Sequence, residues 1–342
     1  MGHTEEPVPD SITSLLAAAL AARADLFDAR RESAFRLFNG FFEGCPDLVV
    51  DLYARTVVLH NYADPPQDAR AVIQAAQEYL RAQLPWVNAA ILKTRNAPEA
   101  AARNGVILQG EKPDRRVRDP KGGVWYAVEL LLNRDASFYL DTRNLRRWAT
   151  HHLKGKTVLN TFAYTGSLGV AAQAGGASRV VHLDRNRVFL NVAKTSYTLN
   201  GLPIHKPDFQ AGDFFSSVSR FKREGTLFDC VLVDPPFFST TSKGTVDLVN
   251  ESHRVINKVR PLVADGGYLV AINNALFVSG AEYMRTLESL CADGYLSIEE
   301  LIPVPPDFTG YPQTIVRTPP VDPAPFNHST KIAALRVRVR RK

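Results

Sequence analysis

From Thr157 onward, short apolar runs typical of strands alternate regularly with segments that have the spacing of helices. Strands are expected over residues 157–160, 180–183, 228–233 and 268–272, with helices after Gly166, Arg185, Asp213 and Val246. Later apolar runs over 296–304 and 332–339 would complete the sheet. This alternation predicts an α/β fold, in which helices wrap a parallel sheet and ligands bind beyond the carboxyl ends of the strands.

The residues before this alternation follow another pattern. A helix is expected from residue 11 to about residue 32, then a hairpin of strands over 48–53 and 56–62. A helix over 66–84, a strand over 89–92, a polar connector over 104–120 and a strand over 124–132 come next, and a helix should carry residues 143–148. We therefore expect an N-terminal helical segment over 1–34, a small α+β domain over 35–130 and an α/β domain over 131–342.

Cysteine content and charge narrow the possible environment. Cys45, Cys230 and Cys291 are odd in number and far apart, so they predict neither a disulfide framework nor a zinc site, and a reducing cytoplasm fits best. The acidic start, residues 1–6, does not resemble an export signal, and no early apolar run approaches the roughly 20 residues that span a membrane. The net charge of +6 permits a polyanionic partner without requiring one.

Three turns of the predicted sheet carry residues suited to a nucleoside. In the first turn Gly166 permits positive φ and a close approach of ligand to backbone. With only Gly166 and Gly169 present, the glycine pattern of dinucleotide-binding proteins is a poor match, which disfavours a nicotinamide oxidoreductase. Asp184 ends the next strand, where a carboxylate can accept hydrogen bonds from both ribose hydroxyls. In the third turn Asp213 could accept from an adenine amine and Phe214 could pack on the ring, although Asp213 could equally be an N-cap.

A rigid turn follows the expected strand over 228–233. Asp234 is followed by Pro235 and Pro236, which restrict the backbone and leave no amide donors, and then by Phe237. Such an acceptor-rich edge could hold a ring that bears an amino or imine group, stacked on the phenylalanine. The alternative is a turn after a buried strand, with two core phenylalanines.

Together these turns resemble a known family. Residues 158–166, Asp184, residues 212–213 and residues 234–237 are similar to the successive motifs of class I S-adenosylmethionine-dependent methyltransferases, and within them of the large-subunit ribosomal RNA methyltransferases. Residues 138–146 resemble the signature that precedes the first motif in that group. The resemblance covers residues 130–342 well and 35–128 more weakly. It implies a Rossmann-like seven-stranded sheet and a small domain that recognises RNA.

The same resemblance implies a cofactor and its contacts. The cofactor would be S-adenosyl-L-methionine, and no metal is implied. The residues expected to bind it are Asp141, Arg143, Asn160, Thr161, Phe162, Tyr164, Thr165, Gly166, Asp184, Arg185, Asp213, Phe214 and Asp234.

The reacting edge favours a nitrogen target. Methyl transfer is an in-line displacement that depends mainly on alignment, and Asp234, Pro235 and Phe237 are the expected catalytic residues. Transfer to carbon-5 of a pyrimidine needs a cysteine nucleophile. The family's carbon-5 members carry one after the paired prolines or after the next strand, where this chain has Phe237 and residues 272–274.

Residues 239–243 and the Asn273–Asn274 pair instead resemble the guanine-N7 member that acts on 23S ribosomal RNA. The two asparagines could read a base edge or simply form a turn, and methylation of an exocyclic amine stays open. Substrate contacts are expected from Phe237, Phe238, Lys243, Asn273 and Asn274.

The expected activity is methyl transfer to a nucleobase nitrogen of RNA, and the expected partner is ribosomal RNA or a pre-ribosomal particle. The alternatives are another acceptor, such as cytosine carbon-5, a protein or a small molecule, or an RNA-binding protein that keeps the fold without turnover. Two basic segments, over 112–118 and 336–342, could contact phosphates. For the first we favour a solvated loop over a phosphate contact, and for the second we favour protection of an edge strand.

Overall fold

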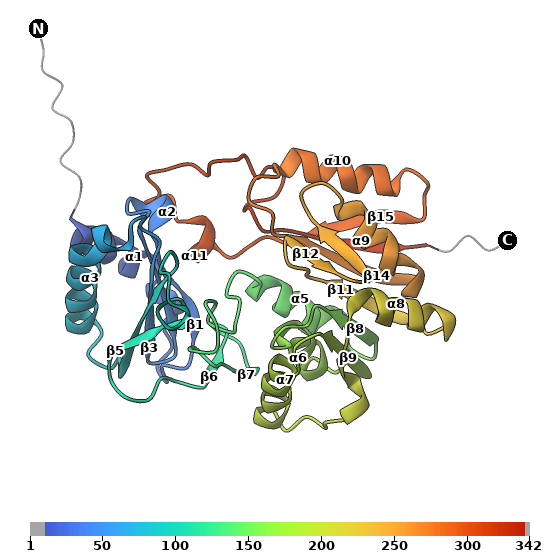
Figure 1. The fold of residues 1–342 in the computed structure, drawn as a ribbon, viewed down its shortest axis with the longest axis horizontal. Helices are drawn as coiled ribbons and strands as arrows, with labels where there is room; N and C mark the ends of the chain where they lie inside the picture. Colours follow the sequence, from blue (N-terminus) through green and yellow to red (C-terminus); the bar gives the residue numbers. More distant parts are fainter. Residues whose placement is uncertain (1–10, 339–342) are drawn as a thin grey trace, which may run out of the picture. The chain divides into compact units, whose positions relative to one another are not determined.

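The computed structural model describes residues 11–338, which form two compact units (Figure 1). The first unit contains residues 11–121, together with residues 130–136 and 306–319. The second contains residues 122–129, 137–305 and 320–338. The chain therefore passes between the units several times. The contiguous domains expected from the sequence, with a boundary at residue 130, do not follow these units. The predictions for residues 1–6 and for the basic residues 340–342 lie outside the described residues.

The first unit is built on a five-stranded sheet in the order β1-β2-β3-β4-β5. The β3–β4 pair is parallel and the other pairs are antiparallel. Helices α1 and α3 pack on one face, where residues such as Leu16, Phe35, Val50, Leu59 and Ile73 form the core. The strands and helices of this unit are β1 (Ala34–Asn39), β2 (Leu48–Tyr53), β3 (Thr56–Asn61), β4 (Ala89–Thr94), β5 (Val106–Gln109), β6 (Arg116–Arg118), α1 (Ile12–Ala22), α2 (Gly40–Glu43), α3 (Arg70–Gln83), α4 (Ala100–Asn104) and α11 (Pro306–Thr309).

The hairpin and the helix expected over 66–84 are confirmed as β2, β3 and α3, whereas other boundaries differ. The first helix was expected to run to about residue 32 but ends at Ala22. It ends early because Arg23 turns into the core and the Asp28 carboxylate accepts the backbone amides of Glu32 and Ser33, which fixes a turn. The expected connector over 104–120 includes the short strands β5 and β6, and the strand expected over 124–132 is limited to β7.

The second unit has a seven-stranded sheet in the order β10-β9-β8-β11-β14-β16-β15. The first five strands of this order are parallel, and β16 is antiparallel to both of its neighbours. The alternating α/β fold with a seven-stranded sheet is thus confirmed. The strands of this unit are β7 (Trp125–Ala127), β8 (Thr157–Thr161), β9 (Arg179–Asp184), β10 (Phe209–Ala211), β11 (Phe228–Val233), β12 (Phe238–Thr241), β13 (Gly244–Asp247), β14 (Val263–Asn273), β15 (Leu296–Leu301) and β16 (Lys331–Val337).

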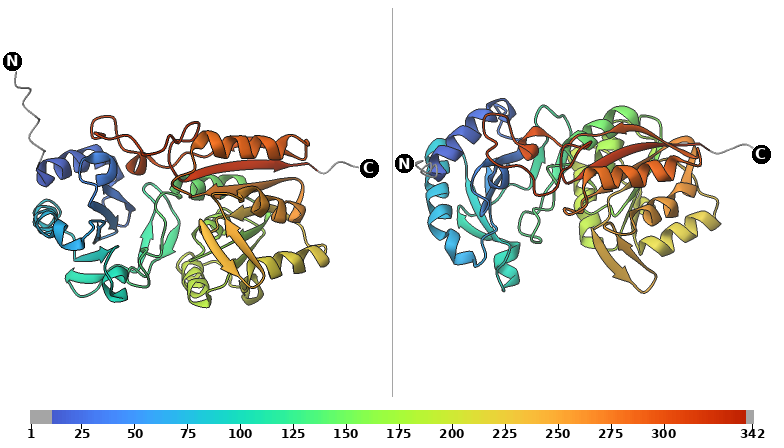
Figure 2. Two further views of the ribbon diagram at one scale, coloured as in Figure 1. Left: turned by 45° about the horizontal axis from the view of Figure 1, so that its top comes forward. Right: turned by 90° about the horizontal axis from the view of Figure 1, so that it is seen from above.

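Helices cover both faces of this sheet. One set, α5, α6 and α7, packs together along one face, and α8, α9 and α10 pack over the core on the other. Figure 2 shows α10 running alongside β15 and β16. Because the sheet order reverses between β8 and β11, the turns after these strands diverge and leave room for a ligand at the carboxyl edge. The helices are α5 (Arg143–His152), α6 (Ser167–Ala174), α7 (Arg187–Leu199), α8 (Phe214–Arg223), α9 (Ser252–Val259) and α10 (Gly280–Cys291).

Two features of this unit differ from the predictions. The helix expected after Val246 is α9, which begins at Ser252, and the β12–β13 hairpin that precedes it was not predicted. The last strand, β16, lies between β14 and β15, so Arg336 does not protect a sheet edge. Arg336 instead lies 3.7 Å from the centre of the Tyr268 ring and pairs with Glu299 at 3.2 Å.

Candidate active site

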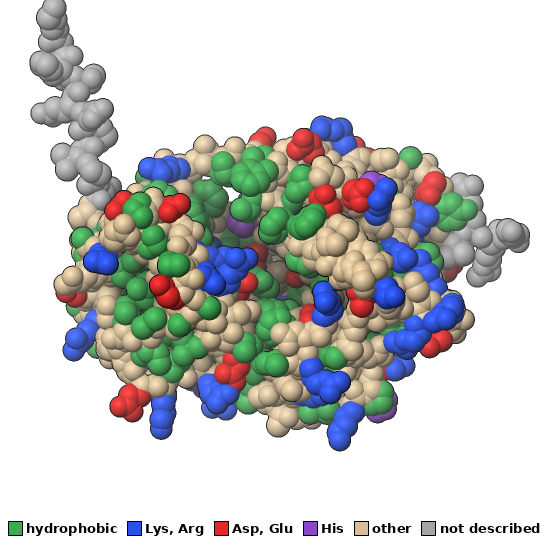
Figure 3. Space-filling model, viewed as in Figure 1, with side chains coloured by type: hydrophobic (Ala, Val, Ile, Leu, Met, Phe, Trp, Pro, Cys, Tyr) green, Lys and Arg blue, Asp and Glu red, His purple; other side chains and the backbone are tan. Residues whose placement is uncertain are grey.

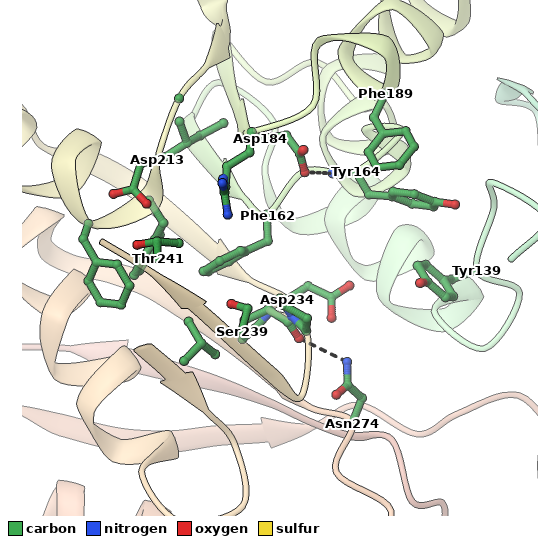
Figure 4. Close-up of a pocket in the computed structure, with 18 of the residues that line it drawn as sticks. Tyr139, Phe162, Tyr164, Asp184, Phe189, Asp213, Asp234, Ser239, Thr241 and Asn274 are labelled. Atoms are coloured by element: carbon green, nitrogen blue, oxygen red, sulfur yellow. Dashed lines mark hydrogen bonds between the residues drawn. The ribbon is translucent and has the colours of Figure 1, made fainter. Parts of the chain in front are cut away.

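A pocket of about 380 Å³ opens at the carboxyl ends of the parallel strands in the second unit (Figure 4). Its walls come from the turns after β8, β9, β10 and β11, from the β12–β13 hairpin and from the segments around residues 140 and 330. The lining residues are Tyr139, Asp141, Thr142, Phe162, Tyr164, Leu183, Asp184, Arg185, Phe189, Gly212, Asp213, Phe214, Phe215, Asp234, Pro235, Pro236, Ser239, Thr241, Val246, Asn274 and Thr330.

The turn after β8 has an unusual backbone. Phe162, Tyr164 and Gly166 have φ angles of 52°, 50° and 79°, all in the left-handed region. This conformation places the Phe162 and Tyr164 side chains on the pocket, as Figure 4 shows. A Cβ atom on Gly166 would lie 2.6 Å from the Cβ of Ala193 in α7, so glycine is required for both backbone angle and packing.

Asp184 holds this turn in place from the end of β9. One carboxylate oxygen accepts the amide of Tyr164 at 2.8 Å and the other accepts the amide of Asn186 at 2.8 Å. Burial raises the pKa of Asp184, although these amides stabilise its charge. The carboxylate therefore connects the first and second turns and still has lone pairs for hydroxyl donors of a ligand.

Asp213 caps a helix and also lines the pocket. Its carboxylate accepts the amide of Ser216 at 3.0 Å, as an N-cap of α8 should. Burial opposes ionisation of Asp213, but hydrogen bonds from Ser216 and Thr241 outweigh it and lower the pKa. The two roles weighed from the sequence are therefore compatible in one side chain.

Aromatic rings form much of the remaining wall. The rings of Phe162 and Phe214 are 4.5 Å apart between centroids, and those of Tyr164 and Phe189 are also 4.5 Å apart. Tyr139 extends this wall, with its ring 5.3 Å from that of Tyr164. Such a surface suits a planar ring.

Two carboxylates lie at the other end of the pocket. Burial, together with the negative charge of Asp141, raises the pKa of Asp234 to about 7. Asp141 is held by the Thr330 hydroxyl, which donates to its carboxylate at 2.9 Å. Asn274 donates its side-chain amide to the Pro235 carbonyl at 3.1 Å, a contact drawn in Figure 4. A pair of neighbouring carboxylates favours a cationic ligand.

The structure brings to this pocket ten of the residues expected from the sequence to bind cofactor or substrate or to act in catalysis. The ten are Asp141, Phe162, Tyr164, Asp184, Arg185, Asp213, Phe214, Asp234, Pro235 and Asn274.

Other expected cofactor residues support the pocket without lining it. The Asn160 side chain in β8 does not reach the pocket, and its Nδ2 atom lies 3.4 Å from Nδ1 of His182 in β9. Thr161 and Thr165 donate their hydroxyls to backbone carbonyls, those of Leu232 at 2.8 Å and Ser137 at 2.6 Å. Gly166 belongs to the turn itself but does not line the pocket, and neither does Arg143, the first residue of α5.

The expected substrate residues divide between the pocket and its surroundings. Asn273 is buried; its amide donates to the Leu248 carbonyl at 3.1 Å and its oxygen accepts the Ala275 amide at 3.0 Å, so it forms the turn after β14. Phe237 and Phe238 project into solvent, and Lys243 lies exposed in the β12–β13 turn.

Several lining residues were not singled out from the sequence. Tyr139 is part of the signature over 138–146 and could have been found there. Phe189, Phe215, Val246 and Thr330 carry no motif of their own, because helix and hairpin packing places them at the pocket. Ser239 and Thr241 lie in the segment over 239–243 that the resemblance had indicated, although neither was named as a site residue.

These residues fit S-adenosylmethionine, the cofactor that the motif resemblance implies. Asp184 would accept from the ribose hydroxyls, Asp213 and Phe214 would contact the adenine, and Asp141 and Asp234 offer negative charge to a cationic sulfonium. Among residues 11–338 no cluster of three or more His, Cys, Asp or Glu side chains is arranged to hold a metal ion. Within the same range no helix combines the length and the apolar character needed to span a membrane.

Known proteins with similar sequences are methyltransferases. Residues 36–314 match the family model described as S-adenosylmethionine-dependent methyltransferase. The chain is 30% identical over 280 residues to ribosomal RNA large subunit methyltransferase I of Aeromonas hydrophila, covering 81% of this chain and 69% of that protein. It is 25% identical over 290 residues to the protein of the same name from Photobacterium profundum, covering 85% and 73%.

Solved structures show the same fold. A methyltransferase in complex with S-adenosylhomocysteine has a TM-score of 0.82 at 21% identity, covering 97% of this chain and 83% of that chain. An S-adenosylmethionine-dependent methyltransferase from Streptococcus mutans has a TM-score of 0.79 at 20% identity, with the same coverage of 97% and 83%. The family match spans most of the chain and both units. The chain therefore belongs to the S-adenosylmethionine-dependent methyltransferase family, and it is an enzyme that takes its methyl group from S-adenosylmethionine.

Proposed function

We propose that this enzyme transfers a methyl group to a nucleobase nitrogen of RNA, with guanine in large-subunit ribosomal RNA as the target. The names of the similar curated proteins support ribosomal RNA as the acceptor. The net charge of +6 is compatible with a polyanionic substrate. The small domain expected over residues 35–130, most of which lies in the first unit, would recognise the RNA.

The observation that carries a nitrogen target is the position of the cysteines. None of the three lines the pocket. Cys230 is buried within β11 and its pKa is raised by burial, so the reactive thiolate is disfavoured. Cys45 is in the first unit and Cys291 ends α10. Carbon-5 methylation needs a cysteine that adds to the pyrimidine ring, whereas a ring nitrogen attacks through its own lone pair.

The side chains at the edge would align the base more than activate it. The Pro235 carbonyl is oriented by Asn274, and the two prolines hold the turn rigid. Bound S-adenosylmethionine supplies an electrophilic methyl group. Guanine N7 needs no proton removed, so this edge suffices for it.

A second target is favoured by Asp234. A carboxyl whose pKa is about 7 is suited to accept a proton near neutral pH. An exocyclic amine loses a proton on methylation, so that target would use Asp234 as a base. Methylation of guanine N7 removes no proton and would not use Asp234 as a base.

Mass spectrometry of ribosomal RNA nucleosides, from cells with and without this protein, tests the proposal. We expect one methylated guanine to disappear from the large-subunit RNA and to return when purified protein and S-adenosylmethionine are added. Loss of 5-methylcytosine would overturn the nitrogen target, and an unchanged nucleoside profile would overturn the RNA acceptor. N2-methylguanine as the missing base would favour the Asp234-assisted alternative over N7.

We expect affinity for S-adenosylmethionine to rise up to about tenfold between about pH 6 and pH 8, with little change for S-adenosylhomocysteine. A carboxyl of pKa about 7 is mostly protonated at the lower pH and mostly ionised at the higher one. The cationic sulfonium prefers the ionised form, whereas the thioether product is indifferent. Calorimetry in buffers of different ionisation enthalpy would measure the proton that Asp234 releases when S-adenosylmethionine binds. Asp234→Asn should remove this pH dependence, and equal pH dependence for both ligands would contradict the assignment.

A further inference from the structure

Two neighbouring loops at the pocket mouth present large apolar side chains to solvent. Phe237 is 57% exposed and Phe238 54%, in the segment that follows the paired prolines. Leu276 is 59% exposed and Phe277 80%, in the loop between β14 and α10. We call these four residues the aromatic rim. Among residues 11–338, Phe277 is the most exposed large apolar side chain. Figure 3 shows hydrophobic side chains at the surface near the start of α10.

The backbone that carries the rim is held firmly. The Asn274–Pro235 hydrogen bond at 3.1 Å joins the two loops. The Phe237 carbonyl accepts the Leu248 amide at 2.9 Å, which fixes the first loop to the far end of the hairpin. The Ala275 carbonyl accepts the buried ammonium of Lys331 at 3.1 Å, which fixes the second. The exposed rings are therefore presented by an ordered scaffold.

The rim is continuous with the reacting edge of the pocket. Pro236 and Ser239, on either side of Phe237 and Phe238, line the pocket, and so does Asn274, two residues before Leu276. A substrate that reaches the edge must therefore pass the rim. Exposed aromatic rings are costly in water, and their placement at a site entrance is typical of a surface that contacts a ligand.

Charged side chains of both signs lie around the rim. Lys243 is exposed at the tip of the hairpin. The nearby Asp247 carboxylate accepts the amides of Val249 and Asn250 at 3.0 Å, and Glu282 accepts the Ser279 amide at 2.8 Å in the α10 capping box. These acids are thus engaged with backbone donors, while the lysine projects outward.

We propose that the aromatic rim, and Phe277 in particular, stacks on nucleotides that flank the target base in single-stranded RNA. The inference rests on the proposed RNA acceptor and adds the chemical form of the substrate. Aromatic stacking tolerates any base, and proteins that bind single-stranded RNA combine such rings with cations that track the backbone. A duplex would hide the base faces, so an unpaired or extruded segment is the occupant that the rim selects.

Fluorescence anisotropy with a labelled single-stranded, guanine-containing RNA tests the rim. Phe277→Ala should weaken RNA binding roughly 10- to 100-fold, the range typical for loss of one stacking ring, and Phe277→Tyr should restore most of it. Affinity for S-adenosylhomocysteine, measured by calorimetry, should not change. A plot of log affinity against log salt concentration should keep the same slope in Phe277→Ala. In Lys243→Ala the slope should be less steep by about one, since only the lysine is expected to contact phosphate.

Leu227→Ala is the matched control, because Leu227 is 55% exposed but precedes β11 at the opposite end of the sheet. It should bind RNA like the wild type. If Phe277→Ala binds RNA within twofold of the wild type, the rim inference fails alone. If the wild type binds S-adenosylhomocysteine but no RNA, both the rim and the RNA acceptor fail. Loss of a wild-type dimer in Phe277→Ala, with RNA binding intact, would identify the rim as a contact between copies of the chain and overturn the inference.

Discussion

Replacing Arg23 with alanine is expected to lower the free energy of unfolding of the first unit by about 3–5 kcal/mol. Arg23 and Glu43 form a buried ion pair, with side chains 0% and 2% exposed. Two parallel hydrogen bonds of 2.9 Å join the guanidinium to the two carboxylate oxygens. Removing the arginine leaves the Glu43 charge buried without its partner, and desolvation of that charge is the main cost.

The pair also holds a distant part of the chain. Arg23 donates to the Asp307 carbonyl at 3.2 Å, and Thr314 donates its hydroxyl to Glu43 at 2.5 Å. Asn39 donates to the Phe308 carbonyl at 2.6 Å. Residues 306–319 are therefore anchored on the first unit through this network, and we expect the Arg23 variant to release them before the rest of the unit unfolds.

Denaturant unfolding followed by hydrogen exchange in β1 and in residues 306–319 would measure both effects. The double variant Arg23→Met with Glu43→Leu should recover much of the lost stability, because it removes both charges. Arg254→Ala breaks the exposed pair with Glu251 and should cost no more than about 1 kcal/mol. A loss below about 1 kcal/mol in Arg23→Ala would show that the buried pair is not a major contributor.

The Arg23 network shows what the sequence could not reveal about the fold. Six strands of the seven-stranded sheet were predicted because each is an apolar run between turn residues, as in residues 228–233, whereas the three-residue strand β10 was not predicted. The pairing of Arg23 with Glu43 joins residues twenty positions apart with no local pattern, and the return of residues 306–319 depends on contacts made only in three dimensions. The β12–β13 hairpin escaped prediction because residues 239–245 are polar and contain just one glycine.

The candidate site shows a similar division. Residues at the strand ends, such as Asp184 and Asp234, could be predicted because the carboxyl ends of parallel strands always meet at one edge. The direction in which each neighbouring side chain points could not be predicted from the sequence. Asn273 and Asn274 are adjacent, yet the first completes a buried turn and the second lines the pocket. Asn160 faces His182 and the helix layer, because successive residues of β8 point to opposite faces.

Asp184→Asn is expected to weaken S-adenosylhomocysteine binding by about 100-fold, a loss of roughly 3 kcal/mol. Each carboxylate oxygen of Asp184 accepts one backbone amide at 2.8 Å, from Tyr164 and from Asn186. An asparagine would set its amino group against one of these N–H donors, so the turn that carries Phe162 and Tyr164 would lose its anchor. The same change removes one of the two acceptors available to the ribose hydroxyls. Both losses act on the same end of the pocket.

Calorimetry of ligand binding, with thermal unfolding of the ligand-free protein, would separate these effects from general instability. Asp229→Asn is the matched control, because Asp229 accepts the Thr157 amide at 2.7 Å at the amino ends of β8 and β11, away from the pocket. It should lower the unfolding temperature and leave affinity unchanged. A folded Asp184→Asn variant with affinity within threefold of the wild type would exclude Asp184 from the cofactor site. Reduced affinity in both variants would show instead that binding depends on sheet stability, because the two carboxylates share only their role as acceptors of backbone amides at strand ends.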